Sequence, residues 1–185
     1  MNWFKIAQQI EQQYDSLLNS HPSGVNITGS GLNETMSIGG QLINAKDIMN
    51  KVISSISTIL NKNMVKEINT DPISNPNAQG VAISNEPGKV HVDVKKIFNK
   101  YKQVLPANIQ TDGLGIDKDS IDDIVAKISQ EIYGELVNTS SHESKHNLDY
   151  TDLYKQNQPF SNAQEQPAVD FGNKTEKEYK ARFSQ

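Results

Sequence analysis

The chain has 185 residues, of which 35% are hydrophobic, and it carries a formal net charge of −4 with no cysteine. This length suits one domain with a real core, and the missing cysteines exclude disulfides and thiolate metal sites. Without a basic cluster, we expect no nucleic-acid partner. No apolar run has the length of a signal peptide or a membrane span, so we expect a soluble protein with no membrane partner, cytoplasmic or associated with a virus particle, of undetermined oligomeric state.

The first part of the chain is expected to form two helices separated by a loop. Apolar residues recur at helical spacing within residues 1–19, beginning at Trp3. Closely spaced glycines interrupt any regular pattern over residues 20–43, which we expect to be a flexible loop. From Asn44 to Ile68 the apolar residues again recur every three or four positions, which predicts a second helix with the longest apolar stripe of the chain.

The second part of the chain is expected to combine a β-hairpin with further helices. Two short apolar runs, at residues 81–84 and 90–94, flank the sequence Asn-Glu-Pro-Gly, which is typical of a turn between antiparallel strands. Helical spacing then predicts a short helix over residues 94–104, a long helix that begins near Ser120, and a final helix that begins near Asn162.

The long helix decides how the most informative motif is placed. Its apolar stripe continues through Leu136, and the same spacing reaches residues 142–146 unless Gly134 or the polar run 138–141 interrupts the helix. Together these elements predict a single α+β domain over residues 1–185, mainly helical, whose core spans residues 44–185.

Residues 142–146 read His-Glu-Ser-Lys-His, which is the HExxH pattern. On a helix, His142 and His146 lie one turn apart on the same face, so both imidazoles can bind one metal ion. Glu143 lies beside them, where a general base must be to act on a zinc-bound water. Without cysteine, any such site has only nitrogen and oxygen ligands.

A hydrolytic zinc site needs a third protein ligand, and more than one downstream carboxylate can supply it. Asp152 stands at the third-ligand position of the extended metzincin motif, HExxHxxGxxH/D, but Asp149 replaces the glycine that lets that chain turn sharply. Asp149 is better suited to orient an imidazole N–H. Glu165 follows His146 by 19 residues, at the expected start of the final helix, which can fold back across the motif helix.

The motif HESKH, followed by Glu165 in the sequence Glu-Gln-Pro-Ala, resembles the gluzincin branch of the zincin metallopeptidases. The resemblance covers residues 119–183 at most. It implies a zincin-like fold, in which the motif helix is backed by helices and by a small antiparallel sheet, here the hairpin at residues 81–94. In that family the edge strand of the sheet binds an extended peptide or protein substrate.

The same resemblance implies roles for individual residues. His142, His146 and Glu165 would bind zinc within the segment 142–165, with Asp152 as the alternative third ligand. Glu143 would take a proton from a zinc-bound water that attacks the peptide carbonyl. Tyr150 and Tyr154 are the nearby candidates for a donor to the developing oxyanion, and we expect Tyr154 to be the catalytic one.

A different class of function is compatible with the same residues. A metal bound by the motif can hold two helices together in a non-catalytic zincin-like module that serves structure or interaction. Such a module would have its metal closed off by a fourth protein ligand, whereas an enzyme keeps one position open. The geometry around the two histidines and Glu165 therefore distinguishes the two hypotheses.

Overall fold

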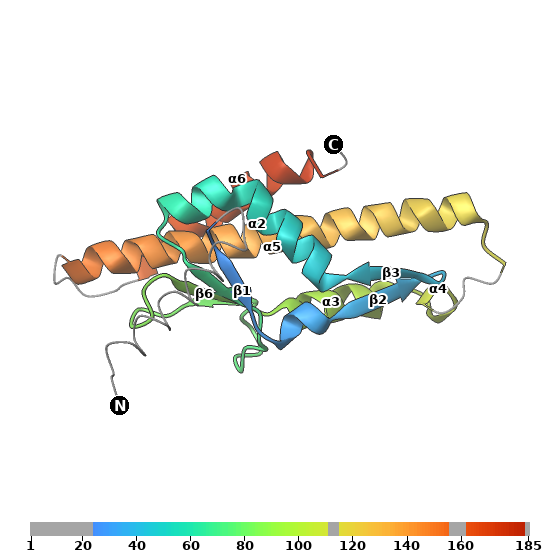
Figure 1. Ribbon diagram of the computed structural model, residues 1–185, viewed down its shortest axis with the longest axis horizontal. Coiled ribbons are helices and arrows are strands. Elements are labelled where there is room, and N and C mark those ends of the chain that lie inside the picture. The colour runs from blue at the N-terminus through green and yellow to red at the C-terminus, as the bar shows by residue number, and fades with distance from the viewer. Residues whose placement is uncertain (1–23, 111–114, 156–161, 184–185) are drawn as a thin grey trace, which may run out of the picture.

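The fold of the computed structural model is α+β and mainly helical, as the sequence predicts (Figure 1). The structure describes residues 24–110, 115–155 and 162–183, and the expected helix within residues 1–19 lies outside these ranges. The described elements are, in chain order, β1 (Asn26–Thr28), the 3-10 turn η1 (Ser30–Asn33), β2 (Thr35–Ile38), β3 (Gln41–Asn44), α2 (Ala45–Lys62), β4 (Glu67–Asn69), β5 (Gly80–Ala82), β6 (Lys89–Val92), α3 (Val94–Val104), α4 (Ala107–Gln110), α5 (Lys118–Lys155), η2 (Asn162–Gln164) and α6 (Glu165–Lys180).

The main sheet has four strands in the order β1-β4-β6-β5. Strands β1, β4 and β6 are parallel, and β5 pairs antiparallel with β6, which confirms the expected hairpin. The sheet is mixed rather than purely antiparallel, so the expectation of an antiparallel sheet holds only for its β5–β6 pair. Among the described strands, β5 lies at the edge of this sheet.

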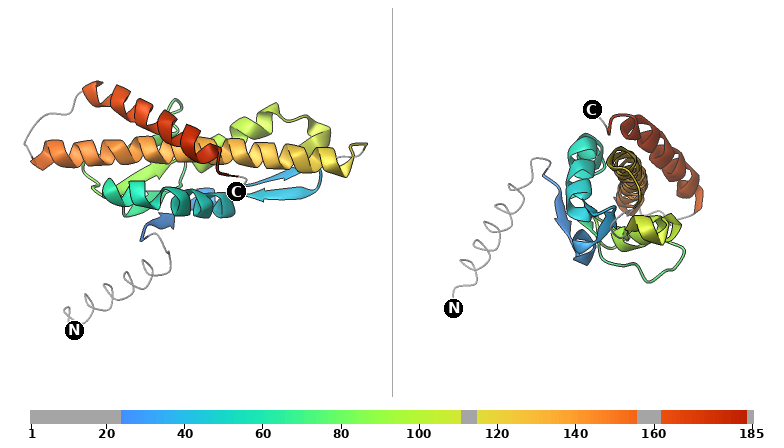
Figure 2. Two further views of the ribbon diagram at one scale, coloured as in Figure 1. Left: turned by 90° about the horizontal axis from the view of Figure 1, so that it is seen from above. Right: turned by 90° about the vertical axis from the view of Figure 1, so that its right-hand side faces the viewer.

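Helix α5 is the centre of the molecule, and the other elements are arranged around it (Figure 2). Helix α2 and the sheet cover one side of α5, and α6 crosses its other side. The core lies where these elements meet, and it includes Ile53 of α2, Ile68 of β4, Val90 of β6, and Tyr133 and Leu136 of α5. Among the described residues, no helix has the length and apolar character needed to cross a membrane.

The expectation of a flexible loop over residues 20–43 is wrong for the described part of that segment. Residues 24–43 contain β1, η1, β2 and most of β3, and β2 pairs antiparallel with β3. Gly39 and Gly40 have φ values of 55° and 81°, the left-handed conformation that a two-residue hairpin turn requires. These glycines therefore mark a tight turn between strands, and Ile38 and Ile43 beside it are buried.

The expected helix over residues 44–68 is correct only as far as Lys62. The side chain of Asn44 caps its start by accepting a hydrogen bond from the Lys46 backbone N–H at 2.8 Å. Met64 then adopts a φ of 63°, which ends the helix, and Ile68 belongs to β4 instead. A buried strand and a buried helix both present apolar residues, so apolar spacing alone does not mark the end of this helix.

Helices α3 and α5 agree with the sequence, whereas the short helix α4 was not expected. Helix α3 spans Val94–Val104, as expected, and its cap is Asp93, whose carboxylate accepts a hydrogen bond from Lys96 N–H at 2.8 Å. Helix α5 continues through Gly134 and the run 138–141 without a break, which carries the HExxH motif on one rigid element. Tertiary packing on both sides of α5 stabilises the residues that would weaken an isolated helix.

Candidate metal centre

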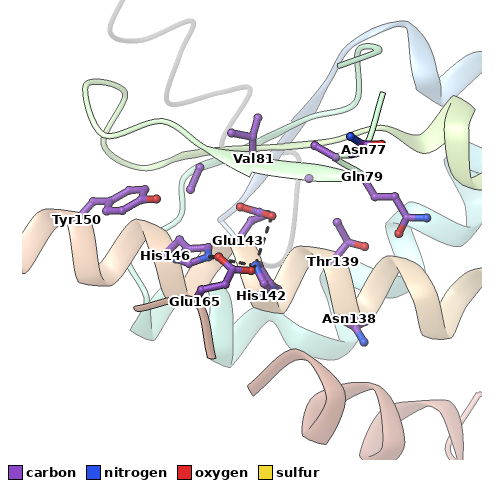
Figure 3. Close-up of a pocket in the computed structure, with 13 residues that line it drawn as sticks. Asn77, Gln79, Val81, Asn138, Thr139, His142, Glu143, His146, Tyr150 and Glu165 are labelled. Carbon is purple, nitrogen blue, oxygen red and sulfur yellow. Dashed lines mark hydrogen bonds and ion pairs between the residues drawn. The ribbon is translucent and has the colours of Figure 1, made fainter. Parts of the chain in front are cut away.

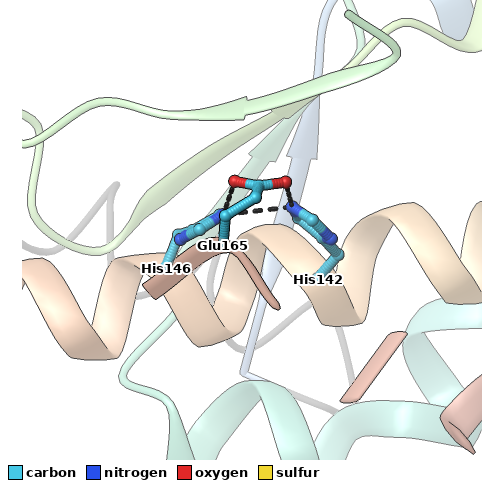
Figure 4. A group of neighbouring side chains, drawn as sticks. All are labelled: His142, His146 and Glu165. Atoms are coloured by element: carbon cyan, nitrogen blue, oxygen red, sulfur yellow. Dashed lines mark hydrogen bonds and ion pairs between the residues drawn. The ribbon is translucent and has the colours of Figure 1, made fainter. Parts of the chain in front are cut away.

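His142 and His146 lie one turn apart on the same face of α5 and direct their imidazoles to the same point (Figure 4). Their Nε2 atoms are 3.0 Å apart, and their ring centroids are 4.7 Å apart. Because α5 extends for several turns on either side of the motif, the separation of the two rings is set by a rigid helix rather than by a loop.

Glu165 is the first residue of α6, and its carboxylate reaches both histidines. Its Oε2 atom is 3.1 Å from His146 Nε2, and its Oε1 atom is 3.5 Å from His142 Nε2. One ligand atom from each residue of this triad lies within 4.8 Å of the others. The described structure thus brings together the three residues that the sequence singled out as metal ligands (Figure 4).

A close contact between α5 and α6 sets the position of Glu165. At Gly172 of α6, an added Cβ would lie 2.6 Å from Asn138 Oδ1 and 3.2 Å from His142 Cβ. Ala168, one turn after Glu165, is fully buried. Only small residues allow the two helices to approach this closely, and that approach carries the start of α6 over the histidines.

The geometry of the triad fits a metal ion. Zinc bonds to imidazole nitrogen and carboxylate oxygen at about 2.0–2.2 Å, so two ligands of a tetrahedral site are roughly 3.4 Å apart. The two Nε2 atoms are 3.0 Å apart, and the two carboxylate oxygens of Glu165 lie 3.1 Å from His146 Nε2 and 3.5 Å from His142 Nε2, so each imidazole has one Glu165 oxygen close to this spacing. Two imidazoles and one carboxylate leave a fourth position, and the Glu165 side chain remains 60% exposed. The triad can therefore hold a divalent ion on the side facing solvent.

One feature of an optimised metal site is missing. A histidine ligand usually donates its second ring N–H to a carboxylate or carbonyl. Here His146 Nδ1 is buried and has no hydrogen-bond partner among the described residues. Asp149, which the sequence suggested for that role, pairs with Lys145 instead. The His146 ring is held by packing, because Tyr150 stacks on it with a centroid distance of 5.6 Å.

Glu143 lies beside the triad and is almost completely buried, with 6% of its surface exposed. Its Oε1 atom is 3.8 Å from His142 Nε2. Burial raises the pKa of this carboxyl to about 8, while a hydrogen bond from the Ala82 backbone acts in the opposite direction. A nearby divalent cation would favour the charged form and lower this pKa.

Burial also shifts the pKa of two other groups beside the cleft. Burial is the main cause that lowers the pKa of His142, and the neighbouring His146 adds to it. Burial likewise raises the pKa of Tyr150.

Tyr150 lines the cleft beside the triad, whereas the side chain of Tyr154 lies outside the described residues. Asp152 is exposed and does not belong to the cluster of approaching ligand atoms.

The triad and Glu143 open into a cleft of about 420 Å³ between α5 and the segment that leads into β5 (Figure 3). The edge strand passes directly over Glu143. An added Cβ at Gly80 would lie 2.8 Å from Glu143 Oε1 and 2.6 Å from Thr139 Cγ2. A larger residue at this position would push the strand away from α5. The cleft therefore has one helical wall that carries the site and one wall of extended chain.

A buried polar network fixes the motif helix from behind, and the sequence did not reveal it. Asn147 donates from Nδ2 to the Asn63 carbonyl and accepts at Oδ1 from the Gly88 N–H, both at 2.9 Å. Asn63 in turn donates to Ser144 Oγ at 2.9 Å. These bonds tie the motif helix to the end of α2 and to the β5–β6 turn. A signal was present, since Ser144 and Asn147 interrupt an otherwise plausible apolar face.

Comparison of the chain with protein-family models, with curated proteins and with solved structures gives no match.

Proposed function

We propose that this protein is a zinc-dependent peptidase with a zincin-like, gluzincin-type site. The observation that supports this most directly is the arrangement of four residues in one cleft. His142, His146 and Glu165 bring one ligand atom each to within 4.8 Å of one another, and Glu143 lies next to them in a buried position. Residues that bind a metal for structure alone do not require a buried carboxylate beside the open face of the site.

Each residue of the site has a distinct role in this proposal. His142, His146 and Glu165 hold the zinc ion. When bound, zinc supplies a Lewis acid that polarises a carbonyl and lowers the pKa of water. Glu143 accepts a proton from the attacking water and delivers it to the amine of the broken peptide bond. Of the two tyrosines considered from the sequence, Tyr150 is the better candidate to donate to the oxyanion, because it lines the cleft.

The edge strand provides a wall to which an extended peptide can add. The Asp93 N–H donates to the Gln79 carbonyl at 2.7 Å, so Gln79 and Asp93 form a hydrogen-bonded pair in the β5–β6 ladder. Bonding alternates along antiparallel strands, and the polar backbone groups of Gly80 and Ala82 therefore point away from β6. The Ala82 backbone reaches Glu143, which is consistent with this direction. Strand addition at Gly80 would place a substrate backbone along the site.

The non-catalytic alternative makes a different demand on the same residues. A structural metal site is closed by four protein ligands and does not need a coordination position that opens into a cleft. Among the described residues only three groups converge, and Glu165 is largely exposed. These features favour the hydrolytic proposal over a purely structural role.

A hydrolysis assay with a chelator control tests the proposal. Purified protein loaded with zinc is incubated with an unfolded, fluorescently quenched protein substrate. We expect cleavage that stops when a zinc chelator is added and returns when zinc is restored. Stoichiometric zinc binding without any cleavage would contradict the enzymatic proposal and favour the structural module. Failure to bind zinc would contradict both.

A further inference from the structure

The cleft extends from the triad toward the N-terminal end of α5, where Gln79, Asn138 and Thr139 lie (Figure 3). Two of these residues carry carboxamides. The nitrogen of a carboxamide only donates hydrogen bonds, and its oxygen only accepts them. The orientation of each carboxamide therefore determines which substrate groups this end of the cleft can bind.

The carboxamide of Gln79 is fixed by a carboxylate behind it. Its Nε2 donates to Glu135 Oε1 at 2.7 Å. The Glu135 side chain is 13% exposed and also accepts from Lys100 Nζ at 2.8 and 2.9 Å and from the Tyr101 hydroxyl at 2.9 Å. A carboxylate held by a lysine only accepts, so Gln79 cannot turn its oxygen toward Glu135. This leaves Gln79 Oε1 as the group that the cleft can use.

Asn138 lines the cleft from α5, but its carboxamide turns toward α6, where an added Cβ at Gly172 would lie 2.6 Å from its Oδ1. Its Nδ2 donates to Asn173 Oδ1 at 3.0 Å and to Glu176 Oε2 at 2.8 Å. The NH₂ groups of both carboxamides are thus engaged by acceptors within the protein. No lysine or arginine lines the cleft among the described residues. Near Gln79, the cleft therefore presents a fixed carboxamide oxygen and no cationic side chain.

We infer that this end of the cleft is a subsite for a substrate side chain that donates hydrogen bonds, namely Lys, Arg, Asn or Gln, and that Gln79 determines this specificity. The inference deepens the proposed peptidase function and rests on it. An aspartate or glutamate of the substrate would place its oxygen atoms against Gln79 Oε1 and lose its hydration without a cation to compensate. An aliphatic side chain would leave Gln79 Oε1 without a partner.

A set of peptides that differ at one position tests the inference by binding as well as by cleavage. A positional-scanning library first identifies the substrate position at which the zinc-loaded protein discriminates. Peptides with Lys, Gln, Leu or Glu at that position are then titrated into zinc-loaded Glu143→Gln protein, and their affinities are measured calorimetrically. We expect Lys and Gln to bind roughly tenfold more tightly than Glu, with Leu between them.

Two substitutions separate the role of Gln79 from general damage to the fold. Gln79→Met keeps the size of the side chain but removes the acceptor, so the preference for Lys and Gln over Leu should disappear. Glu135→Gln gives Gln79 a partner that also donates, which allows its carboxamide to turn and present its NH₂ group. That variant should bind the Glu peptide at least about fivefold better than the wild type does. Glu131→Gln, one turn earlier on α5, is the matched control and should change nothing.

The outcomes distinguish the inference from the proposed function. If the wild-type protein cleaves peptides in a manner that depends on Glu143 but accepts Glu as readily as Lys, the subsite inference is overturned while the peptidase proposal stands. The same conclusion follows if Gln79→Met retains the full preference. If no peptide is bound or cleaved by zinc-loaded protein, the peptidase proposal fails first and the subsite inference fails with it.

Discussion

Helix α5 consists of two halves with opposite surroundings, although it is one uninterrupted helix. In residues 118–128 only Ile121 is buried, and the polar side chains face solvent. In residues 132–147 seven polar or charged side chains are buried, namely Thr139, Ser140, Ser141, Glu143, Ser144, His146 and Asn147. Burying polar groups costs free energy unless each finds a partner. The second half therefore carries features that stability alone does not explain.

The difference between the halves separates residues that support the site from residues that form it. Ser144 and Asn147 are hydrogen-bonded and hold the motif helix in place. Glu143 and His146 lie on the cleft side, and His146 Nδ1 has no partner among the described residues. Substitutions in the two halves of α5 should thus give effects of different size and of different kind.

The largest expected effect comes from Glu143→Gln. Removing a general base typically lowers the catalytic rate by about 10²–10⁴-fold, and zinc content should stay at the wild-type level because no ligand is lost. The measurement is kcat/KM on an unfolded substrate, together with elemental analysis for zinc. Glu131→Gln, outside the cleft on the same helix, should keep full activity. Full activity of Glu143→Gln would rule out its role as the base.

The next effect concerns the contact that positions Glu165. Gly172→Ala introduces a Cβ against Asn138 and should push α6 away, which we expect to lower zinc affinity by about 10–100-fold. Gly134→Ala is a matched control in the same helix pair, because the nearest atom to its added Cβ is the flexible Lys180 side chain at 2.8 Å. Competitive zinc titrations compare the two variants. Equal affinities would mean that this close approach does not set the site.

A smaller effect is expected from the supporting network. Asn147→Ala leaves the buried Asn63 carbonyl and the Gly88 N–H without their partner, which should lower the free energy of unfolding by about 1–3 kcal/mol. Lys127→Ala, in the solvated half of α5, should change it by less than about 0.5 kcal/mol. Urea denaturation monitored by circular dichroism measures both. Equal costs would remove the contrast between the two halves.

A further effect, confined to the metal-free protein, is a dependence of stability on pH. The pKa of Glu143 rises from an ordinary 4.5 to about 8 in the folded state because the carboxyl is buried. The stability from this group is fully present below pH 4.5 and is lost as the pH rises through 8. Glu143→Gln lacks this loss, so its melting temperature should exceed that of the wild type by an amount that grows over this window, to about 10 °C. A constant difference across the window would contradict the assigned burial effect.

Much of the site could be predicted from the sequence because it depends on local spacing. The period of one helix places His142, Glu143 and His146, and the apolar stripe from Ile121 to Leu136 predicts that helix. Glu165 required a further step, since it lies on a separate helix. Its position at the start of α6 follows from helix signals near Asn162, and its approach to the histidines depends on Gly172, which local patterns do not reveal.

The errors in the fold arose where one local pattern fits two structures. Two adjacent glycines such as Gly39 and Gly40 are typical of a flexible loop and also of a tight turn, and the pairing of β2 with β3 decides between them. Ile68 continued a helical stripe but pairs in register with Val90 in the sheet. Both outcomes depend on contacts between residues distant in the chain. The polar network around Asn147 likewise joins residues distant in the chain, so local patterns do not reveal it.

Zinc binding by Glu165→Ala is the most direct test of the metal centre, because Glu165 is the one ligand that comes from a different helix. We expect the wild-type protein to bind one zinc ion and Glu165→Ala to bind it at least about a hundredfold more weakly, a larger loss than removal of a residue behind a ligand causes. Asp123→Asn, exposed in the solvated half of α5, should retain the wild-type affinity. Stoichiometric zinc binding by Glu165→Ala with unchanged affinity would contradict the assignment of Glu165 as the third ligand.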